Sequence, residues 1–345
     1  MTAIASPTTA KPVRAGESAL TKRQARLAMI MLAPTFLVLL LVAFYPLART
    51  FLASFTDEPF ANPNAVVNNV GFANYERLFA ITIAPLPEGA RLRDAIDTTK
   101  YQRVSNFTIG SDRYVLAAGD PVWLSSIVNT VVYTIISVTL ELMIGLGVAL
   151  VVNNRFRGRG IMRAVMLIPW AIPTAISTVL WRDMLKDNSA GAVNALLVGM
   201  GILEQPIAWL AQQPLISVIF VDVWKTVPFM SLLLLAGLQT IPGDLYEAGA
   251  VDGATTPQRF FRITLPLLLP TILIALIFRT LDSLRAFDVF QVLLGRATPS
   301  MAVYNYEKLT SDYAYGFASA TGVVIFILIF AFTILYMSLA RVETD

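Results

Sequence analysis

Residues 247–270 read EAGAVDGATTPQRFFRITLPLLLP, a charged stretch with two glycines between two strongly apolar segments. The chain before it reads MSLLLLAGLQTIPGDLY, and the chain after it continues as TILIALIFRT. Asp244 is a candidate helix N-cap, and Gly253 can end that helix in the left-handed conformation that glycine tolerates. Pro257 fits the first turn of a second helix, and Pro266 marks the return to apolar sequence. The pattern predicts two short helices outside the apolar segments, with the charged side chains exposed, namely Glu247, Asp252, Arg259 and Arg262.

The composition indicates an integral membrane protein. Hydrophobic residues make up 56% of the chain and charged residues 14%, and the mean hydropathy is +0.65. A soluble domain has about a quarter charged residues. The chain contains no cysteine and no histidine. Thiol catalysts, the usual general base and the commonest metal ligand are therefore excluded. We expect no catalytic residue, no metal site, no cofactor in this chain and no nucleic-acid partner.

Six apolar segments approach the ~20 residues that a helix needs to cross a bilayer. The fifth is the least uniform, because charged residues interrupt its second half. The segments run over residues 27–44, 124–152, 161–181, 214–238, 265–292 and 318–339.

Basic residues in short loops predict the orientation. They occur in the N-terminal tail and in the loop of residues 153–163, which holds Arg155, Arg157, Arg159 and Arg163 and no acid. Both of these segments, the quoted stretch and the C-terminus should be cytoplasmic. The predicted organisation is a disordered cytoplasmic tail (1–26), a first transmembrane helix (27–53), an extracytoplasmic loop or small cap (54–122), a five-helix core (123–340) with a cytoplasmic loop (239–266), and a cytoplasmic C-terminus (341–345). Within the cap, NFTIGSDRYVLAAGD favours β structure.

The quoted stretch resembles the EAA signature of ABC transporter permeases. The matching anchors are Glu247-Ala248-Gly249, Gly253, Ile263 and Leu265-Pro266, with Gly249 where many members have a second alanine. The segments YPLARTFLASF, VGFANYERLF, SSIVNTVVYT and VWKTVPFMSLLLLAGLQTIPGDLYEAGAVDGA resemble binding-protein-dependent, maltose-type sugar permeases. This resemblance extends over nearly the whole chain from Ala33 onward, although residues 80–119 look like an insertion that most relatives lack.

The resemblance implies an all-α polytopic bundle of six transmembrane helices, the type I ABC importer permease fold. It also implies that the cytoplasmic loop is a coupling helix that docks on an ATPase through the seven anchor residues. The chain has no GxxxxGK[ST] phosphate loop, so ATP and Mg would be bound by that ATPase. The implied partners are a second homologous permease in a heterodimer, two ATPase copies, an extracytoplasmic sugar-binding protein, the sugar and the lipid bilayer.

Charged residues inside the apolar segments need a partner or a function, because each costs about 2.5–3.5 kcal/mol at membrane depth. Pairing near the outer surface is the simpler expectation for Lys225, Arg285 and Asp288. Glu141 should bond to a neighbouring helix, without an assigned function. The resemblance implies a substrate pathway along the helices before and after the coupling loop, formed by Thr226, Phe229, Arg279, Asp282 and Ser283. Phe229 and Trp224 could supply an aromatic surface for a sugar ring.

The leading functional hypothesis is a permease subunit of an ATP-driven importer in a bacterial cytoplasmic membrane. Its substrate would be a sugar, a di- or oligosaccharide such as maltose or trehalose. An importer of glycerol phosphate, a polyol or a polyamine is an alternative. An ion-coupled secondary transporter should instead show midplane carboxylates and inverted repeats. No such repeat is evident in the sequence.

Overall fold

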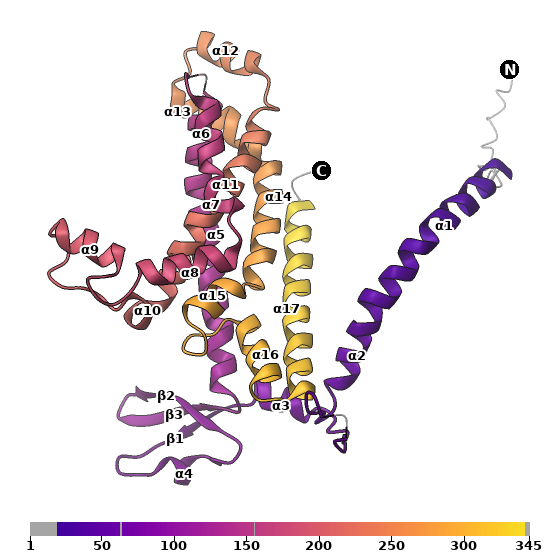
Figure 1. Ribbon diagram of the computed structural model, residues 1–345, viewed down its shortest axis with the longest axis vertical. Helices are drawn as coiled ribbons and strands as arrows, with labels where there is room; N and C mark the ends of the chain where they lie inside the picture. Colours follow the sequence, from indigo (N-terminus) through magenta and orange to yellow (C-terminus); the bar gives the residue numbers. More distant parts are fainter. Residues whose placement is uncertain (1–18, 63, 155, 342–345) are drawn as a thin grey trace, which may run out of the picture. The chain divides into compact units, whose positions relative to one another are not determined.

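The computed structural model describes residues 19–62, 64–154 and 156–341. The described residues divide into two compact units, with the boundary between Leu52 and Ala53 (Figure 1). Parts of the predicted tail (1–18), Arg155 of the predicted cytoplasmic loop, and residues 342–345 of the predicted C-terminus lie outside the described residues.

The helix predicted over residues 27–53 is present and begins earlier. It consists of α1 (Ala19–Leu39), a π-helical turn η1 (Leu40–Phe44) and α2 (Tyr45–Ala53). The stretch Arg23–Ala53 is 31 residues long and strongly apolar, so it is long enough to cross a membrane.

A π-helical turn precedes each of two prolines. Tyr45 N–H donates to the Leu40 carbonyl five residues back, directly before Pro46. In the quoted stretch, η2 (Phe260–Thr264) ends in the same way: Leu265 N–H donates to the Phe260 carbonyl, directly before Pro266. A proline ring clashes with the carbonyl four residues before it, and the wider π turn relieves this clash without ending the helix. The Leu265-Pro266 pair therefore marks a local widening of a continuous helix.

The segment between the first helix and the core contains a small antiparallel sheet. Its strands are β1 (Ile81–Pro85), β2 (Gln102–Ile109) and β3 (Asp112–Ala118), in the order β1-β3-β2. Two short helices lie in the same segment, α3 (Ala73–Phe79) and α4 (Leu92–Ala95). The β structure predicted from NFTIGSDRYVLAAGD is confirmed, with Gly110 at φ +63° in the β2–β3 turn.

Asp120 ties the sheet segment to the helices. It follows β3 directly and caps α5 (Pro121–Asn153), because its carboxylate accepts the Trp123 N–H at 3.1 Å. The same carboxylate accepts the Tyr304 hydroxyl at 2.6 Å, and Arg77 and Lys308 lie 3.6 and 3.8 Å away. Burial and the hydrogen bond to Asp120 raise the pKa of Tyr304 above its ordinary value.

Four long helices form the core of the second unit: α5, α11 (Pro214–Leu238), α14 (Leu265–Leu284) and α17 (Tyr315–Arg341). With the first helix, the described residues hold five helices that are long and apolar enough to span a membrane. α11 packs on α5 and α14 through buried side chains such as Met230, Leu234 and Leu268. Shorter helices complete the unit, α9 (Ala192–Gly199), α10 (Trp209–Gln212), α12 (Gly243–Val251), α13 (Thr256–Arg259), α15 (Asp288–Leu293) and α16 (Met301–Thr310).

The predicted third segment is broken rather than straight. It forms α6 (Arg159–Met166), α7 (Ile168–Ala171) and α8 (Thr174–Met184), and the chain bends by 88° between α7 and α8. If this bent pair counts as one span, the described residues hold up to six candidate spans. The expected all-α membrane bundle is thus confirmed, with the small sheet as an addition. The predicted fifth segment, residues 265–292, is too long, because α14 ends at Leu284 and α15 begins separately at Asp288.

Candidate functional site

The quoted stretch forms a helical loop at the end of the bundle opposite the sheet (Figure 1). α12 ends in a left-handed residue, Gly253 at φ +77°. Gly253 N–H donates to the Ala250 carbonyl at 3.1 Å, and Ala254 N–H to the Gly249 carbonyl at 2.8 Å. This is the Schellman arrangement, so the predicted role of Gly253 is confirmed. Asp244 is not the N-cap as predicted. Pro242 takes that position in an extended conformation, and Asp244 lies in the first turn, where its charge faces the positive end of the helix dipole.

The second helix begins as predicted, with Pro257 in its first turn and a capping box between Thr255 and Gln258. It does not end before the apolar segment. Residues 256–284 form one continuous helical stretch through α13, η2 and α14.

Gly249 brings α12 against this second helix. A Cβ added at Gly249 would lie 3.2 Å from Cδ1 of Ile263 and 3.5 Å from Cγ of Arg259. The Tyr246 and Thr264 hydroxyls lie 3.0 Å apart and form a hydrogen bond. The small residue at 249 therefore serves a contact within the chain, between two of the predicted anchors.

The outer face of the loop is free for a partner. Glu247 and Ala248 are exposed, and Val251 and Phe261 are 88% and 63% exposed. An exposed carboxylate beside apolar side chains is a surface that can dock on another protein. Arg259 is only half-buried, which corrects the expectation that it is fully exposed.

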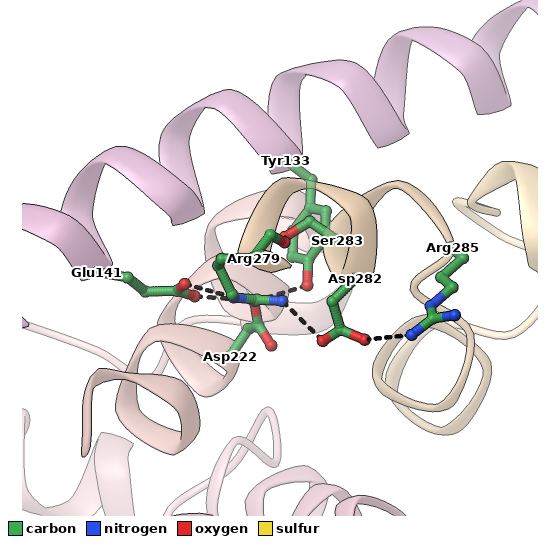
Figure 2. Close-up of polar contacts among 7 residues, drawn as sticks. All are labelled: Tyr133, Glu141, Asp222, Arg279, Asp282, Ser283 and Arg285. Carbon is green, nitrogen blue, oxygen red and sulfur yellow. Dashed lines mark hydrogen bonds and ion pairs between the residues drawn. The ribbon is translucent and has the colours of Figure 1, made fainter. Parts of the chain in front are cut away.

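A buried cluster of charges joins α5, α11 and α14 (Figure 2). Arg279 is 3% exposed and reaches Glu141 through Nε at 2.5 Å and Nη2 at 2.9 Å. Nη2 also donates to Asp222, and Nη1 donates to Asp282 at 3.0 Å. A guanidinium has five donors in a planar fork, and here it faces carboxylates from three helices. The cluster therefore fixes the three helices relative to one another.

Two hydroxyl groups complete the cluster. Tyr133 donates to Asp222 at 2.6 Å, and Ser283 donates to the Arg279 carbonyl at 2.9 Å (Figure 2). Ser283 is fully buried, whereas the Asp282 side chain is 61% exposed. Both residues were predicted to line the substrate pathway, but only Asp282 reaches open space.

That space is a cavity of about 670 Å³. Four of the five predicted pathway residues line it, Thr226, Phe229, Arg279 and Asp282; Ser283 does not. The wall comes from α5, α7, α8, α11, α14 and α15, and thus includes the helices on both sides of the α12 loop. The volume lies in the range of small-molecule sites.

An aromatic pair forms one wall of the cavity. The rings of Trp170 on α7 and Phe229 on α11 are stacked, 5.6 Å apart and 11° from parallel. Trp224, predicted as an aromatic surface for sugar, packs instead edge-on against Trp181 and does not line the cavity. Trp170 was not predicted from the sequence. It lies at the break in the third segment, in the stretch LIPWAIP, where helical periodicity cannot assign a residue to one face of a helix.

The three charges predicted to pair near the outer surface line the same cavity. Arg285 does pair, with Asp282 at 3.5 Å. Among the described residues, Lys225 has no carboxylate within ion-pair distance. Its ammonium donates to the backbone carbonyls of Ile172 at 2.5 Å and Pro169 at 3.5 Å. Asp288 likewise has no cation within ion-pair distance among the described residues, so the prediction of pairing is wrong for Lys225 and Asp288. Glu141 bonds to a neighbouring helix, as expected.

Within the described part of the chain, no group of three or more His, Asp or Glu side chains is arranged to hold a metal ion. The carboxylates that do converge are occupied by the Arg279 guanidinium. The cavity can thus bind a polar molecule through hydrogen bonds and ring contacts.

Comparison with known proteins shows the family. The model of the binding-protein-dependent transport system inner membrane component matches residues 141–342, more than half of the chain. The trehalose/maltose transport system permease protein MalF of Thermococcus litoralis is 40% identical over 56% of this chain and 66% of its own length. The trehalose transport system permease protein SugA of Mycobacterium tuberculosis is 47% identical over 32% of this chain and 36% of its own length. The aligned part thus spans less than two thirds of these relatives.

The fold has a counterpart of known structure. A bacterial ABC transporter involved in the import of the acidic polysaccharide alginate has a chain that superimposes with a TM-score of 0.71, at 22% identity, over 95% of this chain and all of that one. The long helices, the α12 loop and the match over residues 141–342 lead to one assignment. The chain belongs to the family of inner membrane components of binding-protein-dependent transport systems.

Proposed function

We propose that this chain is the transmembrane permease subunit of an ATP-driven importer and that it carries a sugar, a di- or oligosaccharide such as maltose or trehalose. The observation that carries the proposal is the cavity between α7, α11 and α14. It offers the stacked Trp170–Phe229 pair beside the exposed carboxylate of Asp282 and the hydroxyl of Thr226. Sugars present apolar ring faces and hydroxyl groups, and these two kinds of wall suit them. The trehalose and maltose relatives support the same class.

The charges favour a neutral substrate. Among the described residues that line the cavity, each cation already has partners: Arg279 has Glu141, Asp222 and Asp282. Arg285 faces Asp282, and Lys225 donates to two carbonyls. Lys225 has no carboxylate partner in the described part of the chain, but the lining holds as many acids (Asp222, Asp282 and Asp288) as cations. A phosphate or uronate would therefore meet no net positive charge to offset its loss of hydration. A neutral saccharide is therefore preferred over glycerol phosphate or an acidic sugar.

The proposed partners follow from the α12 loop and the family. Glu247, Ala248 and the exposed apolar side chains would dock on an ATPase, which would bind ATP and Mg. Two ATPase copies, a second homologous permease and an extracytoplasmic sugar-binding protein would complete the importer. In this arrangement the α12 loop and both termini lie on the cytoplasmic side of a bacterial cytoplasmic membrane, and residues 54–122 lie outside. Reporter fusions at residues 100 and 254 test this topology, and an extracytoplasmic reporter at 254 contradicts the proposal.

Transport assays test the function directly. The chain is expressed with the subunits that co-purify with it, and the complex is reconstituted in liposomes with its binding protein. Uptake of labelled trehalose and maltose should require ATP and should exceed that of glycerol phosphate and putrescine. Uptake that persists without ATP and collapses with a protonophore supports an ion-coupled transporter instead. Preference for glycerol phosphate would overturn the choice of a neutral sugar.

A further inference from the structure

The break between α7 and α8 leaves backbone carbonyls without helical donors. Pro173 has no N–H, so it cannot donate to the Pro169 carbonyl four residues before it. Ile172 is extended (φ −72°, ψ 131°), so its carbonyl belongs to neither helix. Unpaired carbonyls are costly where the surroundings are apolar.

Lys225 supplies the missing donors. Its ammonium lies 2.5 Å from the Ile172 carbonyl and 3.5 Å from the Pro169 carbonyl, the two carbonyls that the break leaves free. The side chain comes from α11, so a second helix caps the break. A half-buried ammonium at this depth also needs acceptors, and the carbonyls provide them. Lys225 thus supplies donors to the carbonyls at the break, and these carbonyls supply acceptors to its ammonium.

The same pair of helices makes a second contact next to the first. Phe229 lies four residues after Lys225 on α11 and therefore on the same face. Trp170 lies between Pro169 and Ile172 on α7. The ammonium holds the backbone on both sides of Trp170, while the Phe229 ring stacks on the indole at 5.6 Å. All three side chains line the cavity.

We propose that Lys225 is a positioning residue for substrate recognition: by capping the Pro169 and Ile172 carbonyls it fixes the α7–α8 bend and holds the Trp170 ring beside Phe229 as a platform for the substrate. The role of the platform rests on the proposed sugar transport, whereas the capping of the bend does not. The two parts therefore need separate measurements.

Spin labels measure the bend without any substrate. The chain contains no cysteine, so two labels can be placed without removing native residues. Ile161 on α6 and Leu180 on α8 are 73% and 54% exposed, and each is replaced by cysteine. A straight helix would separate these positions by about 28 Å, and a right-angled bend by about 20 Å. Electron–electron resonance on the purified full-length complex gives the distance distribution.

The decisive variant is Lys225→Met, which keeps the length of the side chain and removes the donors. The parent should give one narrow distribution near the shorter distance, and Lys225→Met should broaden it towards the longer one. Lys225→Arg should retain the parent distribution. Lys186→Met is the matched control, because Lys186 is exposed and faces Asp183 at 3.2 Å outside this cavity. An unchanged distribution in Lys225→Met overturns the proposal.

The second measurement is the KM for trehalose uptake. Lys225→Met and Trp170→Ala should each raise KM by about two- to tenfold, and the double variant should raise it no further than the larger single effect. A KM that rises in Trp170→Ala but not in Lys225→Met contradicts the positioning role. Absence of both trehalose and maltose transport in the parent itself defeats the proposed function, while the spin-label result still decides whether Lys225 holds the bend.

Discussion

Arg279 and Glu141 form a two-point ion pair although they lie 138 residues apart in the chain. The pair joins α14 to α5, and both side chains are buried, Glu141 completely. A guanidinium so enclosed is not free to bind a substrate. Its structural effect is to hold the side chain of Asp282 at the cavity wall and to bind the side chain of Asp222, which comes from α11. Removing either partner of a buried pair leaves the other charge uncompensated.

We expect Arg279→Met to destabilise the protein strongly, by about 3–5 kcal/mol, because three carboxylates would then face one another without a cation. Glu141→Gln should cost less, about 1–3 kcal/mol, since the amide still accepts one hydrogen bond. Thermal unfolding of the purified complex in detergent measures both changes. Arg182→Met is the control, because Arg182 is exposed and makes only a 3.5 Å contact to the Val292 carbonyl. Parent-like unfolding of Arg279→Met would show that the cluster is not structural.

Asp282 and its neighbour Ser283 should behave differently in transport. Asp282→Ala removes an exposed acceptor from the cavity and should weaken substrate binding by about 1–3 kcal/mol, seen as a higher KM for trehalose. Ser283→Ala removes a hydroxyl that bonds only within α14, so KM should not change. Both variants should assemble with the ATPase. Equal KM values for the two variants would mean that Asp282 does not contact the substrate.

Gly253→Leu should disrupt the end of α12. The backbone at this position has φ +77°, which is unfavourable for a branched side chain by about 1–2 kcal/mol. Stimulation of ATP hydrolysis by loaded binding protein should fall, while membrane insertion stays normal. Gly243→Leu adds the same bulk at the start of the same helix without a positive φ and with open space around it. If both variants lose stimulation equally, bulk rather than backbone strain is the cause.

Glu247→Lys should weaken docking of the ATPase. Glu247 is exposed, so the substitution leaves the fold intact and reverses the charge that the loop offers to its partner. The measured quantity is the amount of ATPase that co-purifies with the chain at low and at high salt. Asp252→Lys, on an exposed residue at the end of the same helix, controls for net charge. If the Glu247→Lys variant co-purifies with as much ATPase as the parent does, Glu247 does not belong to the interface.

Asp120→Ala should loosen the junction between the sheet segment and α5. The change removes the N-cap of α5 and leaves the buried Tyr304 hydroxyl without its acceptor. The loss should be about 1–3 kcal/mol. Limited proteolysis between residues 80 and 119 should become faster than in the parent, and Asp112→Ala at the exposed start of β3 should leave the rate unchanged. An unchanged rate in Asp120→Ala contradicts this role of the cap.

Local chemistry explains which features were predictable from the sequence. The turn at Gly253 and the start at Pro257 depend on a few neighbouring residues, so their spacing predicts them. The apolar segments are predictable because a bilayer requires their length. The extent of the fifth segment was misjudged because Arg285 leaves the helix, and hydropathy does not register a change in backbone conformation.

The cavity was harder to predict because its walls meet only in three dimensions. Asp282 and Ser283 were both predicted to line the pathway, but the rotation of α14 about its axis, which buries Ser283, is not set by the local sequence. Glu141 could be recognised as a buried acid, yet nothing local identifies Arg279 as its partner. Trp170 and the carbonyl partners of Lys225 lie at a proline break, where periodicity ends. The contacts in the cavity wall are therefore set by the tertiary structure and not by the local sequence.

The close contact between Gly249 and Ile263 means that a movement of α12 would tilt the whole continuous helix that contains α14. α12 is fastened to the near end of the continuous helix by this contact and by the Tyr246–Thr264 hydrogen bond. Asp282 lies 17 residues beyond Leu265, which corresponds to about 26 Å along the axis. A tilt of about 5° imposed on the loop would carry Asp282 sideways by about 2 Å. A displacement of that size breaks hydrogen bonds. In the proposed transporter, a small rotation of the α12 loop would thus change the contacts between Asp282 and a bound substrate.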